Sequence, residues 1–225
     1  MPNIRKQLNF NPSELWYLIG LIASDGCLSK DGRHIEITAK EQDFLEKLRS
    51  QIGLKGKTGV KNKGKTNQAY HIQISNKNFY EFLLSVGLKQ RKSLNLGKID
   101  VPGDNFTDFC RGVIDGDGNI RKWAHPVNNK EQWSLRIYSS SPLFLNWLEN
   151  RISFYLKAGG RVYKNKPRKF RSDTYVLKYG KMAAKEIFKR CYYPQALALG
   201  RKAQLAKQCC RSRSGWGRGK AVSLN

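Results

Sequence analysis

The segment CRGVIDGDG (residues 110–118) ends an apolar run on aspartates and glycines, and an earlier segment, LIGLIASDG (18–26), has the same layout. The likeness continues downstream in the same order and with similar gaps. The later matching pairs are FLEKLRSQIGL (44–54) with FLNWLENRISF (144–154), VKNK (60–63) with VYKNK (162–166), YHIQIS (70–75) with YVLKYG (175–180), and RKS (91–93) with RKA (201–203). An ordered internal repeat of this kind predicts two homologous halves.

We place the N-terminal half at residues 1–98, the C-terminal half at 99–207, and a basic, Gly/Ser-rich flexible tail at 208–225. The segment KIDVPGDN (98–105) has the Pro and Gly of a linker. Apolar periodicity predicts the order α-β-β-α-β-β-α in each half. The first half has a helix capped by Ser13 and ending at Gly26, a hairpin around 35–37, helix 41–52, strands 57–63 and 68–75, and helix 78–87. The second half has helix 104–117, strands 119–124 and 132–139, helix 142–156, strands 160–166 and 173–179, and helix 181–191.

Small residues four apart mark each motif segment: Gly20 and Ser24 in the first, Gly112 and Gly116 in the second. On a helix this spacing makes a shallow notch, so two such helices can pack with their backbones close. We therefore expect the C-terminal ends of the two helices to lie side by side.

Each of these ends carries an Asp-Gly pair, in which we expect the glycine to be a left-handed helix stop. The aspartates Asp25 and Asp117 fit poorly there, because a helix C-terminus carries partial negative charge. Two converging carboxylates would repel and take up a proton unless a cation joined them. A hard divalent cation such as Mg²⁺ resolves this, and it is the usual choice beside phosphates.

The repeat decides which aspartates matter. Asp117 aligns with Asp25, whereas Asp115 aligns with Ala23. A simple Asp-Gly turn would explain either segment alone but not the notches, and an EF-hand loop is disfavoured by Ile120 at its sixth position. A purely structural helix pair with capped ends stays open.

The charge composition narrows the class of molecule that this protein binds. The 225 residues include 42 Lys and Arg against 17 Asp and Glu, a net charge of +25, which favours a nucleic-acid partner. No stretch approaches the roughly 18 apolar residues of a membrane span, and residues 1–10 lack the apolar core of a signal peptide. We expect an intracellular protein that acts with the genome, in the cytoplasm or nucleoid or in an organelle that encodes it, and is not secreted. Five cysteines without a C-x-x-C pair and three scattered histidines argue against a zinc site.

The basic residues concentrate in two stretches without acids, 55–65 and 157–171. Many are spaced by two, which in a strand puts them on one face, against phosphates. A solvated sheet edge protected by lysines is the alternative. The residues predicted to contact DNA are Lys55, Lys57, Lys61, Lys63, Lys65, Arg161, Lys164, Lys166, Arg168, Lys169 and Arg171, with the matched pairs Arg91-Lys92 and Arg201-Lys202.

The two segments resemble the LAGLIDADG signature, and the chain is similar to single-chain, double-motif LAGLIDADG homing endonucleases over about residues 12–205. The acidic eighth position is intact in both copies, as Asp25 and Asp117. The departures lie where the signature is loose: Ile19, Ala23 and Ser24 in the first copy and Cys110, Arg111, Val113 and Gly116 in the second.

The resemblance implies an α+β fold: two pseudo-symmetric αββαββα halves, with motif helices at the interface and antiparallel sheets forming a DNA-binding saddle. It implies that Asp25 and Asp117 bind Mg²⁺, with the carbonyls of Ser24 and Gly116 as further ligands. Ca²⁺ is then a non-cleaving substitute, and Mn²⁺ a possible cofactor. It also implies a polar or basic residue from a late strand near each scissile phosphate. By repeat alignment these residues are Gln73 and Lys178, with Lys181 as the alternative to Lys178. The matched pairs Arg91-Lys92 and Arg201-Lys202 are a further basic candidate for this position.

The activity implied by the resemblance is metal-dependent, sequence-specific cleavage of both DNA strands, leaving short 3′ overhangs. The chain would act as a monomer on a long, non-palindromic target and would be encoded by an intron. The alternative is a non-cleaving nucleic-acid-binding protein on the same fold, an intron RNA maturase or a transcription regulator. Additional activity on its own intron RNA stays open. A binder of anionic membranes is disfavoured by the lack of a sustained basic amphipathic helix.

Overall fold

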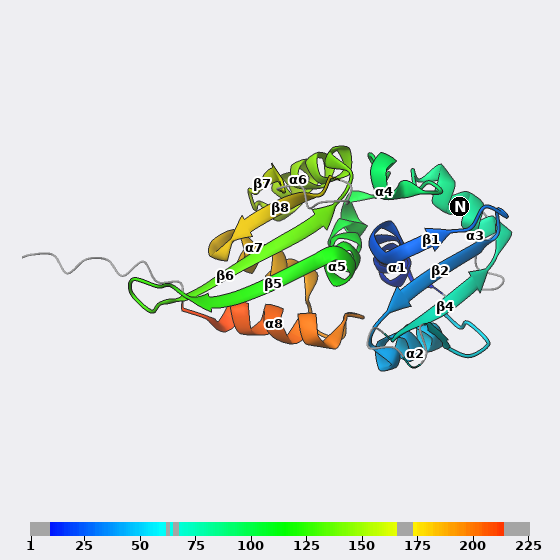
Figure 1. Ribbon diagram of the computed structural model, residues 1–225, viewed down its shortest axis with the longest axis horizontal. Helices are drawn as coiled ribbons and strands as arrows, with labels where there is room; N and C mark the ends of the chain where they lie inside the picture. Colours follow the sequence, from blue (N-terminus) through cyan, green and yellow to red (C-terminus); the bar gives the residue numbers. More distant parts are fainter. Residues whose placement is uncertain (1–9, 62–63, 65–67, 166–172, 214–225) are drawn as a thin grey trace, which may run out of the picture.

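The computed structural model describes residues 10–61, 64, 68–165 and 173–213. Two four-stranded antiparallel sheets lie on either side of a central pair of helices, α1 and α5 (Figure 1). The elements of the N-terminal half are α1 (Pro12–Asp25), β1 (Gly26–Leu28), β2 (His34–Ala39), α2 (Gln42–Gln51), β3 (Gly59–Lys61), β4 (Ala69–Ser75), α3 (Lys77–Ser85) and α4 (Lys92–Asn95). Those of the C-terminal half are η2 (Gly103–Asn105), α5 (Phe106–Asp117), β5 (Gly118–Ala124), β6 (Glu131–Ser139), α6 (Pro142–Leu156), β7 (Arg161–Lys164), β8 (Tyr175–Gly180), α7 (Lys181–Cys191) and α8 (Gly200–Arg211).

The predicted α+β class and element order are confirmed, and helices 142–156 and 181–191 have the predicted bounds. Two details differ. The cap of α1 is Asn11 rather than Ser13, because the Asn11 side chain accepts from the Glu14 amide at 2.8 Å while the Glu14 carboxylate accepts from the Asn11 amide. Helices α4 and α8 were not predicted, and α8 extends to Arg211, past the predicted start of the tail at 208.

The two sheets have the same strand order, β1-β2-β4-β3 and β5-β6-β8-β7. Their registers also agree, since Gly26 lies opposite Ile37 in one sheet and Gly118 opposite Ile137 in the other. Side chains alternate along each strand, as in β4, where Ile72 is buried beneath the sheet. Helices cover the buried face of each sheet and leave the other face open (Figure 1).

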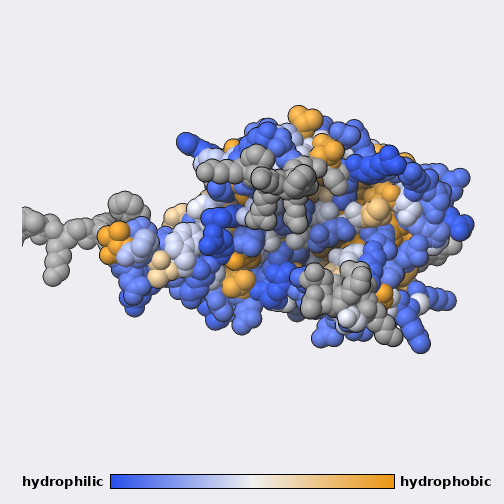
Figure 2. Space-filling view, in the orientation of Figure 1, coloured by the Kyte–Doolittle hydropathy of each residue, from blue (hydrophilic) through white to orange (hydrophobic). Residues whose placement is uncertain are grey.

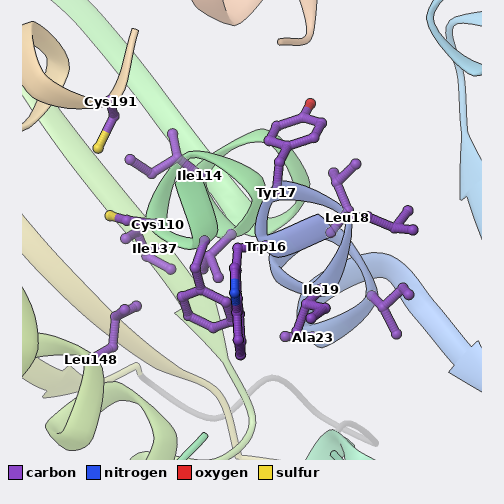
Figure 3. Close-up of a cluster of buried hydrophobic side chains, with 14 of the residues drawn as sticks. Trp16, Tyr17, Leu18, Ile19, Ala23, Cys110, Ile114, Ile137, Leu148 and Cys191 are labelled. Carbon is purple, nitrogen blue, oxygen red and sulfur yellow. The ribbon is translucent and has the colours of Figure 1, made fainter. Parts of the chain in front are cut away.

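The core is continuous through the helix pair. Trp16 and Ile19 of α1 and Ile114 of α5 belong to this cluster, and Ile137 and Leu148 lie on the α5 side of it (Figure 3). The sheets are therefore fixed relative to one another through buried side chains of the two motif helices. Within the described residues, no helix has the length and apolar content needed to cross a membrane.

The predicted notches form the contact between α1 and α5. A Cβ atom on Gly20 would lie 2.2 Å from the Phe109 carbonyl oxygen, and one on Gly112 would lie 2.1 Å from that of Tyr17. One turn later, a Cβ on Gly116 would lie 1.9 Å from Ser24 Oγ. These helices touch backbone to backbone, which only small residues allow.

Candidate active site

Asp25 and Asp117 are the last residues of α1 and α5, and the close packing of these helices brings their ends together. The glycines that follow are not left-handed helix stops, because their φ angles are −83° at Gly26 and −78° at Gly118. Their small size serves a different purpose: a Cβ on Gly26 would lie 2.6 Å from the Ile22 Cα, because each strand leaves directly along its helix. The aspartates thus lie at the inner edges of the two sheets.

Burial shapes the electrostatics of this pair. It raises the pKa of Asp117 to about 6, with a further contribution from the charge of Asp25. Burial also raises the pKa of Asp25, whereas the nearby ammonium groups of Lys202 and Lys92 lower it. Two carboxylates that repel each other, Asp117 half-buried and Asp25 exposed, match the predicted need for a cation at this point.

Two lysines already lie at these helix ends. Lys202 Nζ donates to the carbonyl oxygens of Ile114, Asp115 and Gly116 at 2.8, 2.5 and 2.9 Å. Lys92 Nζ donates to the Ser24 carbonyl oxygen at 2.9 Å. Carbonyls in the last turn of a helix lack intrahelical partners, and a cation there is favoured by the helix dipole.

These contacts bear on two predictions. Lys92 and Lys202, offered as further basic residues near the scissile phosphates, lie beside the aspartates but are buried, with exposed fractions of 8% and 2%, so their contact with DNA stays a prediction. The carbonyls of Ser24 and Gly116 accept hydrogen bonds from ammonium groups, which would repel a metal ion at the same oxygens. The sequence could not show this, because it did not reveal that α4 and α8 begin beside the motif helices.

The donor set nevertheless fits a hard divalent cation. Asp25 and Asp117 supply carboxylate oxygens, and their raised pKa values reflect charge that a cation would offset. In the described part of the chain, no group of three or more His, Cys, Asp or Glu side chains converges on a possible metal position. A metal ion held here would therefore draw its other ligands from water and phosphate oxygens.

Two open cavities flank the aspartates, and each combines both halves of the chain. One, of about 270 Å³, places Asp117 and Tyr138 of the C-terminal half beside Lys92 of the N-terminal half. The other, of about 320 Å³, places Asp25 beside Arg201. The two halves therefore complete each other's sites.

Gln73 and Lys178 occupy equivalent positions, as the repeat alignment predicted. Gln73 lies opposite Glu36 in one sheet and Lys178 opposite Arg136 in the other, both exposed on the open faces. Gln73 lies in β4, two strands away from β1, which follows Asp25, and Lys178 lies in β8, two strands away from β5, which follows Asp117. Cα atoms that face each other across two strand spacings are about 10 Å apart. Neither lines the two cavities, so their proximity to a scissile phosphate stays a prediction. Lys181 instead donates to the Glu131 carbonyl oxygen at 3.0 Å.

The predicted DNA contacts fall into different settings. Arg161 is exposed and lies opposite Lys178. Lys61 is ion-paired with Glu36 and Lys164 with Asp173, which reduces the positive charge that each presents. Lys55 and Lys57 are exposed before β3 rather than on a strand, Arg91 is exposed, and the exposed Arg201 pairs with Glu41 at 2.5 Å. The described residues do not include Lys63, Lys65, Lys166, Arg168, Lys169 or Arg171.

Hydrophilic side chains cover most of the open sheet face, with scattered apolar spots (Figure 2). The face includes Arg121 and Trp123 of β5, which the sequence reasoning did not single out. Alternation along the predicted strand 119–124 was the available signal for both.

A buried polar network was also missed. Arg111 donates to Asp108 at 2.7 Å and to the carbonyl oxygens of Leu197 and Cys191, between the rings of Tyr17 and Tyr193. Asp115 is buried beside this network and accepts three hydrogen bonds. Most of these partners lie about eighty residues away in sequence, so no local pattern indicated them.

Comparison with known proteins agrees with this geometry. Residues 12–87 match the family model of the LAGLIDADG-like domain. The match lies within the N-terminal half, and the fold of the whole chain is like the two-domain fold of I-DmoI. No curated protein matches the sequence significantly.

Three solved structures illustrate the likeness of fold. I-DmoI in complex with DNA and Ca shares 17% identity at a TM-score of 0.56, covering 88% of this chain and 100% of its own. The meganuclease I-SmaMI, bound to uncleaveable DNA, shares 11% identity at a TM-score of 0.58, covering 89% of this chain and 90% of its own. DUF199/WhiA from Thermatoga maritima shares 14% identity at a TM-score of 0.55, covering 89% of this chain and 60% of its own. Other I-DmoI structures were obtained with Mg or Mn.

Proposed function

We propose that this chain is a homing endonuclease: a sequence-specific, divalent-metal-dependent enzyme that hydrolyses both strands of DNA and leaves short 3′ overhangs. The observation that carries the proposal is the meeting of Asp25 and Asp117 at the ends of two helices packed backbone to backbone. Two neighbouring carboxylates repel each other, and that repulsion is offset when a cation and a phosphate bind together beside them.

In this proposal Asp25 and Asp117 hold Mg²⁺, with Mn²⁺ as an alternative and Ca²⁺ as a substitute that permits binding without cleavage. A metal held by these two carboxylates would supply an activated water and would offset negative charge on the leaving 3′-oxygen. Lys92 and Lys202 keep positive charge within the site and fix the helix ends that present the aspartates. Gln73 and Lys178 would contact the DNA from the open sheet faces.

The partner in this proposal is a long, non-palindromic DNA duplex lying across both sheets. One chain carries both aspartates, so the active species is a monomer. We also propose an intron-encoded origin and action at the genome, with the chain's own intron RNA as a further partner.

A second candidate function is nucleic-acid binding without cleavage, as in an intron RNA maturase or a transcription regulator. The fold likeness to WhiA supports it, because that likeness is similar in extent to the likeness to I-DmoI. Retention of both motif aspartates supports the endonuclease instead, since a protein that only binds has no use for two carboxylates that repel each other at these helix ends.

A cleavage selection separates these candidates. A randomised or host-derived DNA library is incubated with the protein in Mg²⁺, and the new ends are sequenced. Wild type should release defined ends, whereas Asp25→Asn and Asp117→Asn should bind the recovered site in Ca²⁺ with wild-type affinity and not cut it. Asp100→Asn, which changes an exposed carboxyl in the linker, is the matched control and should cut normally. Retained cleavage by Asp117→Asn would overturn the assignment.

A further inference from the structure

Asp115 is the motif carboxylate left without a role in the proposed chemistry. We propose that it is a positioning residue for Lys202, and through Lys202 for one of the two strand-cutting centres. The proposal rests on the endonuclease function proposed above, but its structural part can be tested without cleavage.

The Asp115 carboxylate is 3% exposed and accepts three hydrogen bonds. Its Oδ2 accepts from the Tyr17 hydroxyl and from the Leu199 amide, both at 2.8 Å, and its Oδ1 accepts from the Tyr192 hydroxyl at 2.7 Å. Tyr17 belongs to α1, whereas Tyr192 and Leu199 belong to the connection from α7 to α8. One side chain therefore fixes where α8 begins relative to both motif helices.

The contacts then close into a ring. The Leu199 carbonyl oxygen accepts from the Lys202 amide at 2.9 Å, which starts the first turn of α8. From that turn, Lys202 Nζ returns to the carbonyl oxygens of Ile114, Asp115 and Gly116. Asp115 thus contacts the first turn of α8 twice. Its carboxylate accepts from the Leu199 amide, and its backbone carbonyl accepts from Lys202 Nζ.

The N-terminal half lacks this arrangement. Ala23 takes the place of Asp115 and offers no side-chain acceptor. Lys92 follows Arg91, a residue with a left-handed φ of 49° that caps α4 without a side-chain hydrogen bond, and it donates to Ser24. Lys92 is thus placed by backbone geometry, whereas Lys202 is placed through Asp115. Loss of Asp115 should accordingly affect one centre and spare the other.

Strand-resolved cleavage tests this asymmetry. With each strand labelled in turn, Asp115→Asn should slow one strand by about 10- to 100-fold, the scale expected for a misplaced group. The other strand should be cut at the wild-type rate, so nicked DNA should accumulate. Equal slowing of both strands would mean that Asp115 supports the fold in general, and would overturn the proposal.

A double-variant comparison links the effect to Lys202. Lys202→Met should slow the same strand, and adding Asp115→Asn to it should cause no further loss, because both changes act through one ammonium group. Multiplicative losses would show that Asp115 acts by another route and would contradict the proposal.

Lysine acylation measures how accessible the Lys202 amine is, and it requires no DNA cleavage. In folded wild type Lys202 should be protected, whereas in Asp115→Asn it should react several-fold faster while Lys92 remains protected. Unchanged protection of Lys202 would refute the positioning role. Inactive wild type with the expected acylation pattern would instead refute only the endonuclease function.

Two more variants keep the test decisive. Asp108→Asn removes another buried carboxylate of α5, one that contacts Arg111 and Tyr193 rather than Leu199, so Lys202 should stay protected. If Asp115→Asn fails to fold, Tyr192→Phe removes one of the three hydrogen bonds at little change in volume, and it should show the same strand-selective effect in weaker form. A Tyr192→Phe variant that slows both strands alike would count against the proposal.

Discussion

Gly20 and Gly112 face each other across the two motif helices so closely that a Cβ on either would lie 3.0 Å from the Cα of the other. No side chain separates the backbones at this point, and the aspartates follow on the next turns. The spacing of the carboxylates is therefore set by glycine, not by the chemistry of the site itself.

Gly112→Ala should consequently damage both stability and activity. The added methyl group meets the Tyr17 carbonyl oxygen, so the helices must separate, at a cost of about 1–3 kcal/mol in the free energy of unfolding. Denaturant unfolding and cleavage assays would measure the two effects. Gly97→Ala is the control, since its Cβ meets nothing within 4 Å. Equal stability of the two variants would contradict the close-packed interface.

Metal binding should be visible as stabilisation even without DNA cleavage. Ca²⁺ at about 100 times its dissociation constant should raise the free energy of unfolding by about 2.7 kcal/mol. Asp117→Asn removes one of the two carboxylates and should abolish the rise, while Asp100→Asn should keep it. Thermal unfolding with and without Ca²⁺ measures this. A full rise in Asp117→Asn would place the metal elsewhere.

The metal-free protein should lose stability as pH rises through about 6. Burial raises the pKa of Asp117 from 3.8 to about 6, so the folded state holds this proton more tightly than the unfolded state does. Both states are protonated below the unfolded value, and above about 6 the penalty reaches about 3 kcal/mol. Asp117→Asn should flatten this pH dependence in urea unfolding. If the free energy of unfolding of the wild type rises between pH 3.8 and about 6, the predicted loss of stability is wrong.

Cleavage should have a bell-shaped pH profile. Asp117 must be ionised, which requires a pH above about 6, and Lys202 must be charged, which requires a pH below about 8. Single-turnover rates on bound DNA would show the two limbs. The alkaline limb should disappear in Lys202→Met, and its persistence there would assign it to another group.

The open sheet face should contribute salt-dependent affinity. If Arg161 contacts a phosphate, Arg161→Gln should reduce the slope of log affinity against log salt by about 0.9. Arg190→Gln makes the same charge change on helix α7 and should leave the slope unaltered. Binding would be titrated in Ca²⁺ to prevent cutting. Identical slopes for the two variants would favour the solvated-edge interpretation.

Both aspartates lie in one chain, so the complex with DNA should contain one protein molecule. Hydrodynamic mass measurement of the complex would check this, along with the symmetry of the selected site. An obligate dimer on a palindromic site would contradict the two-half architecture.

The fold was predictable because both halves of the chain carry the same pattern of helix and strand signals. The glycines at 20 and 112, the terminal aspartates and the alternation around Gln73 all leave local marks in the sequence. Contacts between distant segments leave none. The repeat pairs Arg201-Lys202 with Arg91-Lys92, but it does not separate Lys202 from Arg201, and only the burial of Lys202 against the end of α5 distinguishes the two. Asp115 looked dispensable because its repeat partner is Ala23, although its hydrogen bonds reach two distant segments, α1 and the connection from α7 to α8.

The interface between the halves has a consequence for exchanging them. Where Gly20 meets Gly112 the contact is main chain against main chain, which at that point demands only small residues of a substitute half. The demands that remain are specific: a glycine where Gly20 stands, and a phenol in the place of Tyr17, since its hydroxyl is the N-terminal half's hydrogen bond to Asp115. A chimaera that keeps both should inherit the centre that Lys202 serves, whereas one with phenylalanine at position 17 would combine two sound halves and leave that centre misaligned.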